Sequence, residues 1–230
     1  MLEWLNKVEG SFYKAFLAED RWKLYFAGLG VTLKVAFFAA ILGLVIGTVI
    51  ALMKLSTGKK GKGTIWSFIA NCYIDVIRGT PSVLQLLIMW FIIMKSCKNG
   101  VLVAVLSFGI NSGAYVAEIV RAGILAVDKG QTEAGRSLGL SKAQTMIYIV
   151  IPQAIKNVLP PIGNEFIVLL KETAIVGYVS LTDLTRAANQ ISSRTYEALI
   201  GAAVIYFVII KILTILLGVL ERRLRKSDNR

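Results

Sequence analysis

Two groups of polar and ionisable residues lie inside otherwise apolar stretches of the chain. Their side chains are of types that could bind a polar or charged solute. One group lies between residues 101 and 127, and the other between residues 162 and 179. Carboxylates can bind an ammonium group, while amides and hydroxyls can orient a polar solute. None of these groups is stable against lipid without a partner. The candidate substrate-binding residues are therefore Asn111, Ser112, Tyr115, Glu118, Asn164 and Glu165.

The first group has the spacing of a helix face. Asn111, Tyr115 and Glu118 follow one another at helical intervals. Lipid offers no hydrogen-bond partner to Asn111 or Ser112, so this face is expected to look at protein or water. Glu118 also lies three residues before Arg121. Two interpretations are equally open: a carboxylate that faces the solute, or one that only neutralises Arg121 near the inner interface.

The second group contains Asn164, Glu165, Lys171 and Glu172. A charge at the centre of a membrane costs on the order of 3 kcal/mol, so partners or water must offset these three ionisable groups. We expect one side of this helix to face a hydrated cavity or a subunit interface. The alternative is a structural ion-pair ladder between Glu165, Lys171 and Glu172.

Further ion pairs are predicted from spacing and depth. Asp75 and Arg78 are three residues apart and can pair along one helix. Lys211 lies deep within the last apolar stretch and is expected to pair with an acid on a neighbouring helix. The residues assigned to gating or ion pairs are Arg121, Lys171, Glu172 and Lys211.

Composition decides the class of protein. Of the 230 residues, 56% are hydrophobic and only 17% are charged, and the mean hydropathy is +0.66. Apolar runs of membrane-spanning length are also present. These values predict an all-α polytopic membrane protein with about five transmembrane helices. The net charge of +12 is concentrated in short loops between apolar runs, which favours membrane topology over a nucleic-acid partner.

The topology follows from the apolar runs and their flanking charges. Residues 1–28 are interpreted as an amphipathic external leader, with Phe12, Phe16 and Leu17 on one face. Pro81 should break the second run. The N-terminus is expected outside and the C-terminus in the cytoplasm, with residues 180–197 as an external gate element, a landing site or a solvated loop. The predicted spans are residues 35–53, 81–94, 101–127, 162–179 and 199–220, and residues 65–80 are expected to form a helix at the inner face.

Small residues recur every fourth position in the first span and predict a face for close helix packing. They are Ala39, Gly43, Gly47 and Ala51.

The polar segment at residues 127–157 carries helix start and stop signals and should form a compact cytoplasmic loop of short helices. Ser141 with Gln144 forms a capping-box pattern, which predicts a helix starting at Lys142. Gly139 stands where an earlier helix, from about residue 132 to 138, would need a left-handed stop. The small Ala134 and Gly135 would let the surface of a partner approach closely.

The sequence Glu133-Ala134-Gly135, with Gly139 four positions on, resembles the cytoplasmic coupling loop of ABC-importer permease subunits. Gly135 departs from the alanine more usual in that family. Five further matches are similar to the polar amino-acid uptake branch, the permeases of histidine, arginine and glutamine type: Arg78-Gly79-Thr80-Pro81 with Gln85, residues 114–123, Pro152-Gln153-Ala154, Asn157-Val158-Leu159-Pro160 and Asn164-Glu165-Phe166.

The resemblance implies a type I ABC-importer fold, with residues 1–230 as one transmembrane permease domain in a bacterial or archaeal cell membrane. It implies ATPase coupling through Glu133, Ala134, Gly135 and Gly139. The implied partners are a second permease subunit (identical or a close paralogue), two ATPase subunits, an extracytoplasmic amino-acid-binding protein and the amino acid. ATP and Mg would be bound by the partner ATPase. No cofactor, metal or catalytic residue is expected on this chain.

The function predicted is thus the transmembrane subunit of an ATP-driven importer that forms the path for a polar or basic amino acid. Glu165 is the expected partner of a cationic group. The carboxylate partner stays open between Arg121, Lys171 and backbone donors at a helix break.

Three other functions fit the sequence less well. Intramembrane Glu and Lys would suit an ion-coupled secondary carrier, yet no internal repeat is visible. A membrane enzyme is disfavoured because the chain has no histidine and no Gly-x-Ser-x-Gly motif. A purely structural membrane protein would leave the coupling-loop pattern unexplained.

Overall fold

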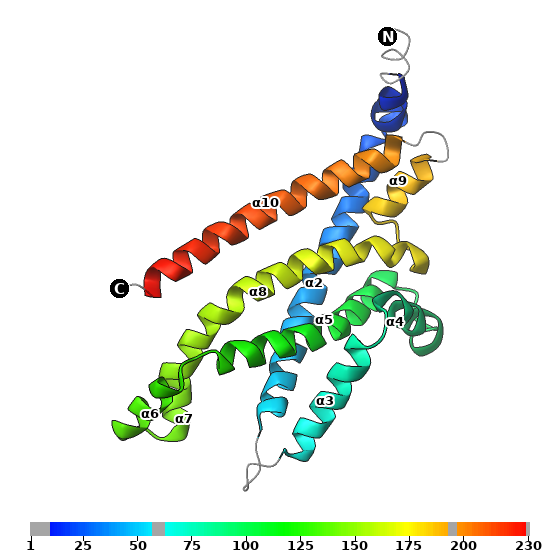
Figure 1. The fold of residues 1–230 in the computed structure, drawn as a ribbon. Coiled ribbons are helices and arrows are strands. Elements are labelled where there is room, and N and C mark those ends of the chain that lie inside the picture. The colour runs from blue at the N-terminus through cyan, green and yellow to red at the C-terminus, as the bar shows by residue number, and fades with distance from the viewer. Residues whose placement is uncertain (1–9, 57–62, 193–196, 229–230) are drawn as a thin grey trace. The chain divides into compact units, whose positions relative to one another are not determined.

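The structure is a computed structural model that describes residues 10–56, 63–192 and 197–228, and its elements are all helices (Figure 1). The α-helices are α2 (Trp22–Leu55), α3 (Ile65–Arg78), α4 (Ser82–Ile88), α5 (Gly100–Leu125), α6 (Lys129–Ser137), α7 (Lys142–Thr145), α8 (Ile151–Glu172), α9 (Leu184–Ser192) and α10 (Glu197–Asp228). Short 3-10 or π-helical turns are η1 (Tyr13–Leu17), η2 (Ala18–Asp20), η3 (Met89–Ile93), η4 (Met146–Val150) and η5 (Thr173–Val179).

Within the described residues, three helices are long and apolar enough to cross a membrane: α2, α5 and α10. A fourth candidate is the bent pair Ile65–Arg78 and Ser82–Ile93, whose two parts meet at 101°. The bend falls at Pro81, as predicted, because proline lacks the N–H that a continuing helix needs. The protein is therefore a multi-pass membrane protein.

The predicted span at residues 162–179 was wrong in its bounds. Helix α8 begins at Ile151, contains Pro160 and Pro161 in its interior, and ends at Glu172, where the 3-10 turn η5 follows. The predicted bounds place both prolines before the helix, as a segment that leads into it. Prolines inside a helix are tolerated where other groups satisfy the freed backbone.

The chain divides into two compact units, and the first comprises Met1–Ala39, Ser82–Phe108 and Ile167–Thr214. Its apolar core joins η1, α2, α9 and α10 through a cluster of buried residues: Ala15, Tyr25, Leu184, Ala188, Ile191, Ala198 and Ala202. The Phe16 ring stacks on Tyr25 at 5.1 Å between centroids. The described part of the leader thus packs on the protein's own core.

The expected single leader helix is also interrupted. Glu19 and Asp20 have φ of 54° and 56°, so the chain kinks within η2, and α2 starts two residues later at Trp22. The Arg21 guanidinium stabilises this corner by donating to the carbonyl oxygen of Lys14 at 2.5 Å. Residues 1–9 of the leader lie outside the described residues.

The second unit comprises Ala40–Pro81, Gly109–Phe166 and Ile215–Arg230, and the small-residue face of α2 packs inside it on α5. A Cβ added at Gly43 would lie 2.9 Å from the Ser112 Cβ, and one at Gly47 would lie 2.6 Å from the Val116 Cβ. Both distances are shorter than real contacts, so only glycine allows this approach. The predicted packing face is confirmed at Gly43 and Gly47.

We predict that Gly47→Ala destabilises the fold by about 1–3 kcal/mol, because the added methyl overpacks the α2–α5 contact. Gly30→Ala is the matched control on the same helix, since nothing lies within 4 Å of its added Cβ. The control should be neutral or stabilising by up to about 1 kcal/mol, the helix propensity gained. The midpoint of SDS-induced unfolding in mixed micelles measures both, and equal midpoints for the two variants would contradict the packing argument.

Candidate functional site

The polar face of α5 is buried by protein within the second unit, as its sequence requires. Asn111 is 4% exposed and Ser112 is 1% exposed. The Ser112 hydroxyl donates to a carboxylate oxygen of Glu165, on α8, at 2.8 Å. Two of the predicted substrate-binding residues, distant in sequence, are therefore brought together, and the Glu165 side chain is half-buried.

One turn further along α5, Tyr115 contacts a residue that we had not placed in the site. The guanidinium carbon of Arg78, the last residue of α3, lies 5.2 Å from the centroid of the Tyr115 ring. The predicted Asp75–Arg78 ion pair does not form among the described residues. Arg78 lies at the end of a helix, just before the break at Pro81 and inside an apolar run. This position could have identified Arg78 as a site residue from the sequence.

Helix α3 is held on α5 by one hydrogen bond and an apolar cluster. The Tyr73 hydroxyl donates to the carbonyl oxygen of Ile110 at 2.5 Å. Ile74 packs with Ala51, Ala114 and Ala117. These contacts fix the end of α3, and so the backbone of Arg78, against the polar face of α5.

Glu118 forms a partly buried ion triad with two cations. One carboxylate oxygen lies 2.5 Å from Nζ of Lys54, and the other lies 2.9 Å from a terminal nitrogen of Arg121. The side chain of Glu118 is 21% exposed. Because both oxygens are occupied, the geometry favours the interpretation in which Glu118 neutralises neighbouring cations. Lys54 was missed, although it is the cation that directly follows the first predicted span.

The other predicted site residues are less enclosed. Asn164, Lys171 and Lys211 are exposed, and Glu172 is half-buried. Within the described part of the chain, neither Lys171 nor Lys211 pairs with an acid, so the predicted partner of Lys211 and the ladder through Lys171 are not formed here.

Residues 127–157, named the coupling segment after the resemblance, have the predicted helix cap and helix stop. The Gln144 N–H donates to the Ser141 hydroxyl at 3.2 Å, and the Ser141 N–H donates to the Gln144 side chain at 2.8 Å, which is the capping box of α7. Gly139 has φ +84°, the predicted left-handed stop. Helix α6 begins at Lys129, earlier than predicted, because Asp128 caps it by accepting from the Gly130 N–H at 2.7 Å.

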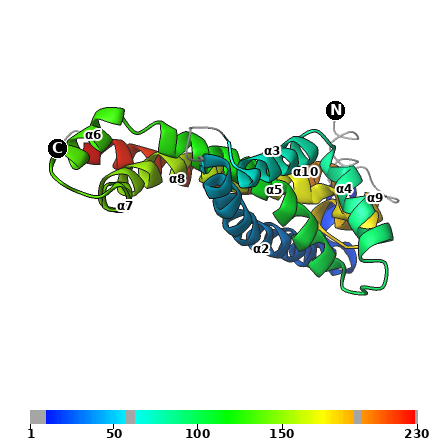
Figure 2. The ribbon, with the colours of Figure 1, turned by 90° about the horizontal axis from the view of Figure 1, so that it is seen from below.

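Helices α6 and α7 lie side by side, and Gly135 serves that contact (Figures 1 and 2). Gly135 is buried, and a Cβ there would lie 2.7 Å from the end of Ile149 and 2.8 Å from the Thr145 methyl. Its small size therefore serves packing within the chain, whereas we had assigned it to the approach of a partner. Glu133 and Ala134 are exposed, as is Leu138 at 82%, which sequence reasoning had not selected.

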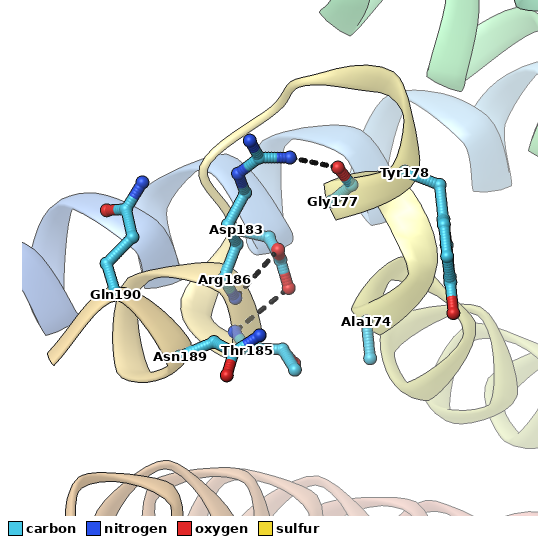
Figure 3. A pocket seen from close by; sticks show the side chains of 8 residues that line it. All are labelled: Ala174, Gly177, Tyr178, Asp183, Thr185, Arg186, Asn189 and Gln190. Carbon is cyan, nitrogen blue, oxygen red and sulfur yellow. Dashed lines mark hydrogen bonds between the residues drawn. The ribbon is translucent and has the colours of Figure 1, made fainter. Parts of the chain in front are cut away.

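The first unit has a polar pocket of about 500 Å³ beside α9, lined by Ala174, Gly177, Tyr178, Asp183, Thr185, Arg186, Asn189 and Gln190 (Figure 3). Asp183 is fully buried and caps α9 by accepting from the N–H groups of Thr185 at 2.9 Å and Arg186 at 3.1 Å. The Arg186 guanidinium donates to the Gly177 carbonyl oxygen. Burial raises the pKa of Asp183, and the two backbone hydrogen bonds offset part of that rise.

Together, the fold and these polar contacts define an all-helical, multi-pass membrane protein with ionisable groups held between its helices. A family of binding-protein-dependent transport system inner membrane components matches residues 43–226. The chain belongs to this family.

Relatives of known name are similar over most of their length. The chain is 44% identical to the arginine transport system permease protein ArtQ of Bacillus subtilis (strain 168) over 207 residues, which cover 87% of this chain and 92% of the relative. It is 36% identical to the glutamine transport system permease protein GlnP of Escherichia coli (strain K12) over 199 residues, covering 84% and 90%.

Solved structures show the same fold. One described as an amino acid ABC transporter with histidines matches with a TM-score of 0.80 and 48% identity, over 87% of this chain and 94% of the other. An inward-facing methionine ABC transporter, MetNI, matches with a TM-score of 0.79 and 17% identity over 90% and 99%, which supports the fold alone. These comparisons give no support to the ion-coupled carrier.

We predict that Asp183→Asn changes how stability depends on pH. The pKa of Asp183 is raised on folding, so its contribution is fully present below the ordinary value of 3.8 and is lost as the pH rises through the folded pKa. The variant cannot ionise and should become more stable relative to wild type over that interval, although asparagine retains one acceptor for the cap. Thermal unfolding from pH 3.8 to neutrality measures this, and parallel curves would refute it.

Proposed function

We propose that this chain is the transmembrane subunit of an ATP-driven importer and forms the path of a polar or basic amino acid. The observation that carries the proposal is the half-buried Glu165 carboxylate, held by Ser112 on the polar face of α5. A carboxylate in this setting suits an ammonium or guanidinium group of the solute. The names of the arginine and glutamine transport relatives agree with such a solute.

In this proposal the coupling segment docks on an ATPase subunit and transmits its motion to the permease. Glu133 and Leu138 project from the α6–α7 corner with exposed side chains. An exposed leucine and an exposed carboxylate on the same short segment suit a groove on a partner that is apolar with a basic rim. In this proposal the partner is an ATPase subunit that binds ATP and Mg, and the present chain transmits the motion without hydrolysing nucleotide.

The assembly proposed has two permease subunits, two ATPase subunits and an extracytoplasmic binding protein that delivers the amino acid. The N-terminus is outside and the C-terminus, with its cluster of arginines, is cytoplasmic. A pair of permease subunits would enclose the polar residues that one chain leaves open, which is the usual outcome of symmetric pairing. Alternation between outward-open and inward-open states then moves the solute.

We predict that Glu165→Gln reduces uptake by about 10- to 100-fold, since a hydrogen bond to a charged group contributes about 1.5–3 kcal/mol. Glutamine still accepts from Ser112, so the complex with the ATPase should assemble normally. The matched variant is Ser112→Ala, which keeps the charge and removes the hydrogen bond, and its effect should be smaller. The measurement is radiolabelled amino-acid uptake into proteoliposomes, and unchanged uptake by the glutamine variant would remove Glu165 from the site.

We predict that Glu133→Arg abolishes amino-acid-stimulated ATP hydrolysis by this chain purified with its ATPase and binding protein in lipid. Reversal places a cation where the groove is proposed to have a basic rim, so docking is lost. Glu197→Arg is the control, a charge reversal at the start of α10 outside the coupling segment, and it should keep the response. If no amino acid stimulates hydrolysis by the wild-type complex, the importer proposal fails; if Glu133→Arg responds normally, the coupling role fails.

A further inference from the structure

Arg78 is a cation whose partner in the described structure is an aromatic ring. It ends α3 at the break before Pro81, and it makes no hydrogen bond or ion pair among the described residues. Its backbone is well anchored. The Gly79 N–H donates to the Asp75 carbonyl oxygen at 2.9 Å, and the Thr80 hydroxyl donates to the Val76 carbonyl oxygen at 2.9 Å.

The cation–π contact leaves the binding edge of Arg78 available. The contact places the guanidinium carbon 5.2 Å from the ring centroid, and the guanidinium N–H donors have no hydrogen-bond acceptor among the described residues. Those donors form a fork that matches both oxygens of a carboxylate. The Arg78 side chain is exposed in this chain, so a solute can reach it.

Arg78 and Glu165 contact neighbouring positions of α5. Ser112, which holds Glu165, and Tyr115, which holds Arg78, are three residues apart on α5. Residues at this spacing are neighbours on a helix surface, with about 5–6 Å between their Cβ atoms. An anion from α8 and a cation from α3 therefore converge on adjacent positions of one helix face, and no ion pair joins them among the described residues.

We infer that Arg78 binds the α-carboxylate of the transported amino acid while Glu165 binds a cationic group of the same molecule. This inference rests on the proposed function. Tyr115 is a positioning residue, since its ring contacts the guanidinium. Arg121, another candidate for the carboxylate, already donates to Glu118 through two nitrogens.

The test measures binding to the purified permease–ATPase complex without the binding protein, so that only the transmembrane site selects. Radiolabelled arginine and glutamine are the probes, and the amide of each, which lacks the carboxylate, is the competitor. The wild type should bind the amino acid at least about 10-fold more tightly than the amide. Arg78→Gln should weaken binding of the amino acid by about 10- to 100-fold and leave the affinity for the amide unchanged. The ratio of the two affinities should therefore fall close to one.

Three further variants separate binding from structure. Arg78→Lys should restore part of the preference for the carboxylate, because the charge returns without the fork. Tyr115→Leu removes the ring and should reduce the ratio of the two affinities, and Tyr115→Phe, which restores a ring, should recover most of that ratio. Asp75→Asn is the control on the same helix end and should change neither affinity.

Equal weakening of amino acid and amide in Arg78→Gln would show a structural role and overturn the inference, as would an unchanged ratio. If the wild-type complex binds one of the amino acids but does not prefer it to its amide, the inference fails and the proposed function stands. If the wild type binds neither probe and no amino acid stimulates ATP hydrolysis, the proposed function itself fails.

Discussion

Polar groups inside an apolar layer must find partners within the protein, and in the second unit α5 is where they do so. Its polar face meets Glu165 through Ser112 and the Arg78 guanidinium through Tyr115. Glu118, one turn later, meets Lys54 at the end of α2. Lipid offers none of these groups a hydrogen-bond or ion-pair partner. Their need for such partners within the protein therefore determines which helices pack on α5 and at what rotation.

The close approach of α2 is what makes the burial of this face possible. Glycine at positions 43 and 47 allows the backbone of α2 to lie against Ser112 and Val116, where any side chain would collide. Without the hydrophobic effect to drive helices together in lipid, such contact area is the main source of packing energy. The same geometry excludes lipid from Ser112 and leaves its hydroxyl directed to Glu165.

The proposed site and the coupling segment share two helices. Helix α5 ends at Leu125, four residues before α6 begins at Lys129, and α8 starts directly after the turn η4 that follows α7. Under the proposed function, a displacement of the α6–α7 corner by an ATPase would therefore reach Ser112 along α5 and Glu165 along α8. The Glu118–Arg121 pair lies on α5 between the two places and is a contact such a motion would have to preserve or break.

The sequence by itself determined four features that depend on residues a few positions apart: the capping box at Ser141, the left-handed stop at Gly139, the break at Pro81 and the small-residue face of α2. Tertiary structure decided the partners. Ser112 and Glu165 are 53 positions apart in the sequence, and Lys54 and Glu118 are 64 positions apart. Arg78 contacts Tyr115 and does not pair with the nearby Asp75. Helical spacing states which side chains share a face, but the rotation and approach of each helix depend on all its contacts together, so pairing across helices is decided only by packing.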